Sequence, residues 1–170
     1  MQTRTYLLLI ILYYSMTTLN AQSRSTNTAT GAVSATMRTY SVRLRPEQDL
    51  KQELDALVQR EHIEAGAVLT CVGSLTDVTM RLANQEGPSK WQGHFEIVSL
   101  VGMLSSNGSH LHLSVADSVG TTFGGHLLDG CKIYTTAELL IGVMADLTYT
   151  REPDPAFGYR ELVIRKKKRR

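Results

Sequence analysis

The chain has 170 residues, of which 42% are hydrophobic and 20% are charged, with a formal net charge of +2 at pH 7. This length fits one domain with extensions at its ends, and the hydrophobic share excludes an intrinsically disordered chain. The charge is unevenly spread: between Met37 and Ile164 there are ten Lys and Arg against sixteen Asp and Glu, a net charge of −6. A broad phosphate-binding face on the folded part is therefore not expected.

The first 21 residues have the pattern of a secretory signal peptide. Arg4 precedes an apolar run over residues 7–14, and Ala21 stands before a plausible cleavage point. The run is shorter than the roughly 20 residues that cross a bilayer, so no transmembrane anchor is expected after signal removal. Residues 22–36 are then a polar linker, and the protein is secreted or periplasmic. The alternative is that Met37 is the true start, which makes the protein cytoplasmic.

From residue 37 onwards the sequence predicts one helix followed by many strands. Residues 38–45 alternate between polar and apolar, which indicates a half-buried strand that Pro46 ends. Over residues 47–62 the apolar side chains recur at helical spacing, which indicates an amphipathic helix. Strands are predicted over residues 67–82, 91–104, 109–116, 132–150 and 159–164. One main helix and strands at hairpin spacing predict an α+β fold with a mainly antiparallel sheet, as a single domain over residues 37–164.

Both cysteines, Cys71 and Cys131, lie in apolar, strand-like segments. In an exported protein they could form a disulfide, although sequence alone does not fix one. Burial of both as small hydrophobic side chains is the other interpretation. Their spacing gives no support to a thiolate zinc site.

Three of the five histidines lie within seventeen residues of one another. His110 and His112 are two apart on a predicted strand and therefore project from the same side. His126 follows a pair of glycines that lets the backbone bend or approach another group closely. Three imidazoles with one coordination position left open suit zinc or another divalent metal. A polar pocket without metal and a purely structural, hydrogen-bonded cluster remain open as alternatives.

Other residues near these histidines are candidates for a ligand pocket. Gly124 and Gly125 either form a nest of backbone N–H groups for an anion or mark a tight turn or close strand packing. His94 and Glu96 share one face of a predicted strand, where they could join a polar cluster or pocket. A charge at Glu96 needs a partner if it is buried, and Arg81 and His94 are the candidates.

A dense basic run closes the chain. Runs of this kind are usually solvated tails that contact nucleic acid or anionic membranes. If the chain binds DNA, this tail must supply much of the attraction. The residues concerned are Arg165, Lys166, Lys167, Lys168, Arg169 and Arg170.

Several segments together resemble the PPC (plants-and-prokaryotes-conserved) domain, in its stand-alone prokaryotic type. They are the Gly-His-Phe-Glu-Ile-Val-Ser-Leu run from Gly93, Gly102, the strand holding His110 and His112, the Gly-Gly-His of residues 124–126 and the Thr-Thr-Ala-Glu-Leu run from Thr135. The resemblance covers residues 37–164. It implies a compact unit built round an antiparallel sheet, assembled as a homotrimer. It also implies a DNA-binding or regulatory role by association with plant members, which carry AT-hooks. The Arg-Gly-Arg-Pro of an AT-hook is absent here.

Two functional classes follow from these observations. The first is a non-catalytic, trimeric PPC module with a histidine-lined metal or small-molecule site, whose subunits bury apolar surface such as that of residues 139–144. The alternative is a small metal-dependent hydrolase or lyase, in which the three histidines activate water and Glu96 or Glu138 moves protons. The sequence has no nucleophile elbow, Walker loop or dinucleotide fingerprint that would support another enzyme class.

Overall fold

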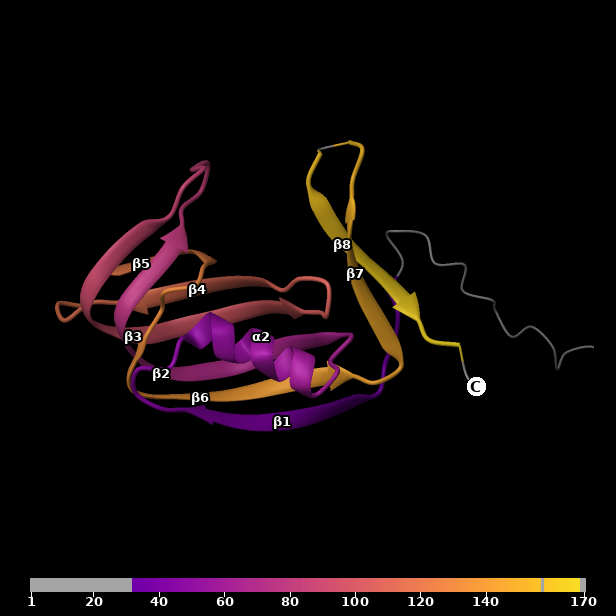
Figure 1. The fold of residues 1–170 in the computed structure, drawn as a ribbon, viewed down its shortest axis with the longest axis horizontal. Helices are drawn as coiled ribbons and strands as arrows, with labels where there is room; N and C mark the ends of the chain where they lie inside the picture. Colours follow the sequence, from indigo (N-terminus) through magenta and orange to yellow (C-terminus); the bar gives the residue numbers. More distant parts are fainter. Residues whose placement is uncertain (1–31, 157, 169–170) are drawn as a thin grey trace, which may run out of the picture. The chain divides into compact units, whose positions relative to one another are not determined.

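Six antiparallel strands form one sheet in the order β1-β6-β2-β3-β4-β5 (Figure 1). The computed structural model describes residues 32–156 and 158–168, so the predicted signal peptide and most of the predicted linker lie outside the described residues. One helix, α2, contributes four buried side chains to the main core, which it shares with the strands. The prediction of an α+β fold with a mainly antiparallel sheet is confirmed. The elements are β1 (Met37–Leu44), α2 (Leu50–Arg60), β2 (Gly66–Arg81), β3 (Ser89–Leu104), β4 (His110–Ala116), β5 (Thr122–Leu127) and β6 (Ile133–Met144).

The residues at which α2 begins and ends are set by its capping interactions, which the spacing of its leucines does not reveal. The Asp49 carboxylate accepts hydrogen bonds from the backbone N–H groups of Lys51 and Gln52, at 3.0 and 3.1 Å. Glu47 has a left-handed φ of 68°, which helix geometry excludes. The helix therefore begins three residues later than the spacing predicts, and it ends at Arg60 instead of at residue 62.

The sheet curls so that its last strand returns to an inner one. In addition to its pairing with β4, strand β5 pairs with the end of β2, where Met80 lies opposite Leu127 and Arg81 opposite His126. Strands β2, β3, β4 and β5 thus form a nearly closed ring around buried side chains such as Leu113. This closure brings residues from positions 81 and 126 together, although they are far apart in the sequence.

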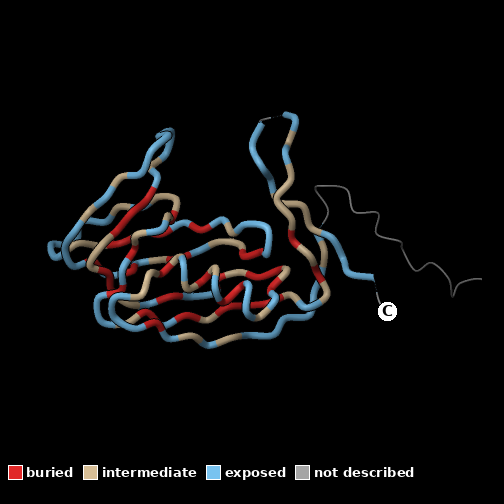
Figure 2. The backbone as a smooth tube through the Cα atoms, viewed as in Figure 1, coloured by how far each residue is buried: buried red, intermediate tan, exposed pale blue. Residues whose placement is uncertain are grey.

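A separate hairpin follows the sheet. The segment predicted as one strand over residues 132–150 is divided by a turn at Ala145 and Asp146, after which β7 (Leu147–Pro153) pairs with β8 (Arg160–Lys166). Asp146 Oδ1 accepts a hydrogen bond from the backbone N–H of Thr36, which fixes this turn. The base of the hairpin is buried through Leu147 and Tyr149, whereas its tip is exposed (Figure 2).

Residues 139–144 offer less apolar surface to another subunit than expected, since only Leu140 and Met144 among their large side chains are partly exposed. Leu139, Ile141 and Val143 are buried in the chain's own core, because β6 lies between β1 and β2. Half of the large apolar side chains that are exposed in the described part of the chain lie on β2 and β3, where Leu69, Val72, Val98 and Val101 are 44–57% exposed.

Both cysteines are free and buried. Burial raises the pKa of each thiol to about 12, so neither is a reactive thiolate at neutral pH. Within the described part of the chain, no helix has the length and apolar character needed to span a membrane.

Candidate metal centre

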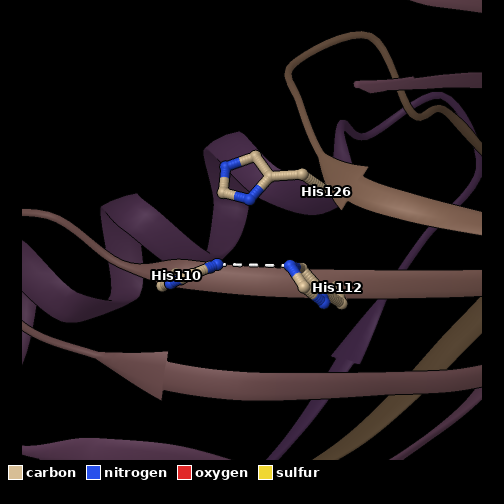
Figure 3. A group of neighbouring side chains, drawn as sticks. All are labelled: His110, His112 and His126. Atoms are coloured by element: carbon tan, nitrogen blue, oxygen red, sulfur yellow. Dashed lines mark hydrogen bonds between the residues drawn. The ribbon is translucent and has the colours of Figure 1, made fainter. Parts of the chain in front are cut away.

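The three histidines predicted to meet do meet. His112 on β4 lies directly opposite His126 on β5, and His110 projects from the same side two residues earlier (Figure 3). One ring nitrogen from each residue lies within 4.8 Å of the other two. Among the described residues, no other group of three or more His, Cys, Asp or Glu has this convergence. The cluster therefore comes from strand alternation in β4 and from the β4–β5 register.

Two contacts in the cluster bear on what it can bind. The Nε2 atoms of His110 and His112 lie 3.2 Å apart, close to the separation of about 3.4 Å expected for two imidazole nitrogens on one zinc ion. The Nδ1 atom of His126 is buried and has no hydrogen-bond partner in the described part of the chain. A buried polar atom is normally satisfied, so this nitrogen is free for a ligand. The donor set of three imidazoles fits zinc or a similar divalent ion.

The pair of glycines explains how β5 reaches its place. Gly124 and Gly125 lie inside β5, and a Cβ atom on either would come within 2.7 or 2.8 Å of a backbone oxygen, of Leu113 or Arg81 respectively. Only glycine therefore lets β5 pass this closely between β4 and β2. Of the alternatives predicted for the two glycines, the structure supports close strand packing, which places His126 over His112, because their backbone is extended as part of β5.

The environment favours the neutral form of His110 and of His126. Burial, followed by the charge of Arg151, lowers the pKa of His110. Burial, followed by the charges of His110 and Arg81, lowers the pKa of His126 to about 4. A metal ligand must be an unprotonated imidazole, so at neutral pH these rings need lose no proton to bind an ion.

A cavity of about 850 Å³ opens beside the cluster. His110 and His126 form part of its wall, together with Ser109, whose buried Oγ also has no hydrogen-bond partner among the described residues. The remaining wall comes from the end of β2, the following turn and the β7–β8 hairpin. Its charged members are Arg81, Glu86, Arg151, Arg160 and Glu161. An ion bound by the histidines would therefore face a space of the size that takes a small ligand.

Two of the predicted pocket residues lie away from this cavity. His94 and Glu96 are exposed on β3, and neither lines the cavity. The His94 ring lies against Tyr134 instead, with ring centroids 4.3 Å apart. The predicted partnership of Glu96 with Arg81 is also not formed within the described residues.

The basic run begins inside the hairpin. Arg165 and Lys166 belong to strand β8 and so are not part of a separate tail. The Arg165 guanidinium pairs with both carboxylate oxygens of Glu152, at 2.6 and 3.0 Å, and Lys167 pairs with Glu64 at 3.0 Å. Lys168 is exposed, whereas residues 169 and 170 lie outside the described part.

Sequence reasoning missed the arginines of the cavity wall. Arg81 lies opposite His126 only because β5 returns to β2, and Arg151 reaches the wall only through the position of the hairpin. Neither arrangement leaves a local pattern in the sequence, so no signal was available for these residues.

Comparison with known proteins identifies a family over most of the chain. The family described as the Plants and Prokaryotes Conserved (PCC) domain, the PPC domain named above, matches residues 31–145. The matched residues end before β7, so the β7–β8 hairpin lies outside them.

Individual proteins are also similar. A bifunctional protein GlmU from Synechococcus sp. (strain JA-2-3B'a(2-13)) is 49% identical over 128 residues, which is 75% of this chain but 20% of that protein. The chain thus spans about a fifth of the length of this curated relative. A solved hypothetical protein from Salmonella enterica is 43% identical, with a TM-score of 0.78, covering 79% of this chain and 97% of the Salmonella chain.

More distant solved structures share the fold. A protein from Archaeoglobus fulgidus, described as metal-containing, is 18% identical with a TM-score of 0.68, covering 78% of this chain and 99% of its own. A protein from Bacteroides thetaiotaomicron, described as a candidate DNA-binding protein, is 21% identical with a TM-score of 0.66. The match covers 76% of this chain and 96% of the Bacteroides chain. At these identities the likeness shows the fold alone.

Proposed function

Since this chain belongs to the Plants and Prokaryotes Conserved domain family, we propose that it is a metal-binding PPC module. In this proposal His110, His112 and His126 bind one divalent ion, for which zinc is the best fit. The observation that carries it is the convergence of three ring nitrogens within 4.8 Å, with two of the three histidines, His110 and His126, on the wall of a cavity. Three protein ligands leave a fourth position open, which the neighbouring cavity would make accessible to a ligand.

Charge and chemistry also support a metal at this cluster. Three imidazoles without a thiolate or carboxylate among them match the ligand set of several zinc sites that exchange a water or a ligand. The lowered pKa values of His110 and His126 favour the neutral form that metal binding requires. The Archaeoglobus protein, described as metal-containing, has the same fold, which agrees with this proposal.

The module is proposed to act as a homotrimer. The resemblance to the PPC family suggests this assembly, and the exposed apolar side chains of β2 and β3 supply a surface that association would cover. Strand β1 is an edge strand that pairs only with β6 in the described part of the chain. Light scattering should give a mass about three times that of one chain, and a monomer would contradict the trimer.

A metal-dependent hydrolase or lyase is the second candidate, and the open cavity favours it. A metal ion at the histidines would lower the pKa of a bound water, and a carboxylate on the cavity wall would exchange its proton. Glu96 and Glu138 do not line the cavity, so this role passes to Glu161 or Glu86, which do. Hydrolysis of a test ester that is lost in the Glu161→Gln variant would support this candidate.

Binding of DNA has less support than binding of a metal ion. The described body is acidic, and Arg165 and Lys167 of the basic run are paired with glutamates. The names of the Bacteroides relative and of a Ralstonia eutropha protein with the same fold are the main argument for it. Substituting residues 167–170 by Gln should weaken duplex binding at low salt if the run makes phosphate contacts.

Elemental analysis tests the metal centre directly. We expect about one zinc ion per chain in the protein after incubation with Zn²⁺ and gel filtration, and a loss of more than tenfold in the His112→Ala variant. The matched control is His94→Ala, which removes an exposed histidine outside the cluster and should keep the metal. Absence of zinc from the unaltered protein, or equal zinc in both variants, would overturn the proposal.

A further inference from the structure

Arginines gather on the same cavity wall as the histidines. Arg81 lies at the end of β2, Arg151 in β7 and Arg160 at the start of β8, and all three line the cavity beside His110 and His126. Two glutamates, Glu86 and Glu161, also line it. The side-chain charges of the wall therefore sum to a small positive value, which a divalent ion at the histidines would increase.

Two of these arginines have guanidinium groups with nothing to bind. Within residues 32–156 and 158–168, the side chains of Arg81 and Arg151 make no hydrogen bond and no ion pair. The other arginines nearby are engaged: Arg160 donates to the backbone oxygen of Arg151 at 3.1 and 2.7 Å, and Arg165 is paired with Glu152. A guanidinium presents five donors in a fixed plane that matches a carboxylate or phosphate.

The backbone of Arg151 is held firmly on the cavity wall. Its N–H group donates to Oδ1 of Asn107 at 3.1 Å, and its carbonyl oxygen accepts from Arg160. Asn107 lies in the turn between β3 and β4, directly before the strand that carries His110 and His112. The hairpin is thus tied, at the residue that supplies a free guanidinium, to the turn that precedes β4.

Both free guanidinium groups lie near the histidines. Arg81 and Arg151 line the same cavity as His110 and His126. Arg81 is also the cross-strand neighbour of His126. The two cations and the histidines of the proposed metal site therefore line the same cavity.

We infer that this cavity takes a small anionic ligand whose carboxylate or phosphate oxygens are bound by Arg81 and Arg151. The inference rests on the proposed metal centre in one respect: a further donor atom of the ligand would occupy the open coordination position of the ion. Arg81 lies within the residues that the family matches, whereas Arg151 lies in β7, beyond them.

Calorimetric titration of the zinc-loaded protein with inorganic phosphate and, separately, with succinate tests this inference. We expect one of the two anions to bind, and the affinity to fall about 10- to 100-fold in Arg81→Gln and in Arg151→Gln, because each loses a charge-assisted hydrogen bond. Arg45→Gln, outside the cavity wall, is the matched control and should bind as the unaltered protein does. The comparison of the two anions distinguishes a phosphate ligand from a carboxylate one.

Zinc content measured on every variant separates this inference from the proposed function. If zinc binds and both arginine variants bind each anion as tightly as the unaltered protein, the inference is overturned while the metal centre stands. If zinc does not bind but anion affinity still falls in the arginine variants, the metal centre fails and the anion site stands. Failure of the unaltered protein to bind either anion overturns the inference.

Discussion

The two walls of the cavity are built in different ways. The wall formed by His110 and His126, here called the histidine wall, belongs to the six-stranded sheet. In this sheet β4 pairs with strands on both sides, and the register fixes His112 opposite His126. The wall formed by Arg81, Arg151 and Arg160, here called the arginine wall, comes largely from the two-stranded β7–β8 hairpin. A small buried cluster of Leu147, Tyr149 and Ala65 lies at the base of this hairpin. One wall is therefore held by the main core and the other by a smaller set of contacts. Changes to the hairpin should alter binding of the proposed anion while leaving the proposed metal site intact.

The largest expected effect comes from breaking the histidine wall at its backbone. Gly102 has a φ of 145°, and a Cβ atom there would overlap the backbone oxygen of His110 across the β3–β4 pairing. We expect Gly102→Ala to lower the free energy of unfolding by about 3 kcal/mol or more, because backbone would have to move. Urea unfolding followed by circular dichroism measures this.

The matched control for that experiment is Gly87→Ala. A Cβ atom at Gly87 meets nothing within 4 Å, and its φ lies outside the left-handed region. We expect its unfolding midpoint to stay close to that of the unaltered protein. An equally small change for Gly102→Ala would mean that β3 and β4 do not pair as described and that His110 is held in some other way.

The second effect, on the arginine wall, is smaller and more selective. Asn107→Ala removes the side-chain oxygen that accepts a hydrogen bond from the N–H group of Arg151. We expect a loss of about 1 kcal/mol in the free energy of unfolding, and anion affinity lowered about threefold to tenfold with zinc content unchanged. Calorimetry and elemental analysis on the same samples check this, with Gln52→Ala on the exposed face of α2 as the control. Loss of zinc in Asn107→Ala would contradict the independence of the two walls.

The contrast between the two walls also explains what the sequence could predict. Strand alternation places His110 and His112 on one side whatever the fold, and a glycine pair before His126 signals a close approach of backbone. The position of Arg81 beside His126 depends on the closure of β5 onto β2, which joins residues about 45 apart in the chain and has no local signature.

The division between β6 and β7 was missed for a related reason. The turn at Ala145 and Asp146 contains neither glycine nor proline, and the apolar pattern continues on both sides of it. It is fixed by contacts from distant parts of the chain, namely the N–H groups of Thr36 and Lys167, which donate to oxygens of Asp146. Long-range contacts of this kind set the path of the backbone without changing the local composition.

The smallest effect concerns the ion pair that joins the two strands of the hairpin. Hydrogen bonds from Arg165, and then from Thr150, lower the pKa of Glu152 to about 2, from 4.5 in the unfolded chain. The folded state therefore gains stability from ionised Glu152 above about pH 4.5 and loses it as the pH falls towards 2. We expect the urea midpoint of the unaltered protein to fall slightly more between pH 6 and pH 3 than that of Glu152→Gln, with Glu53→Gln on α2 as the control. The difference should be small because both partners are exposed, and equal slopes in the two proteins would show that the pair does not hold the arginine wall together.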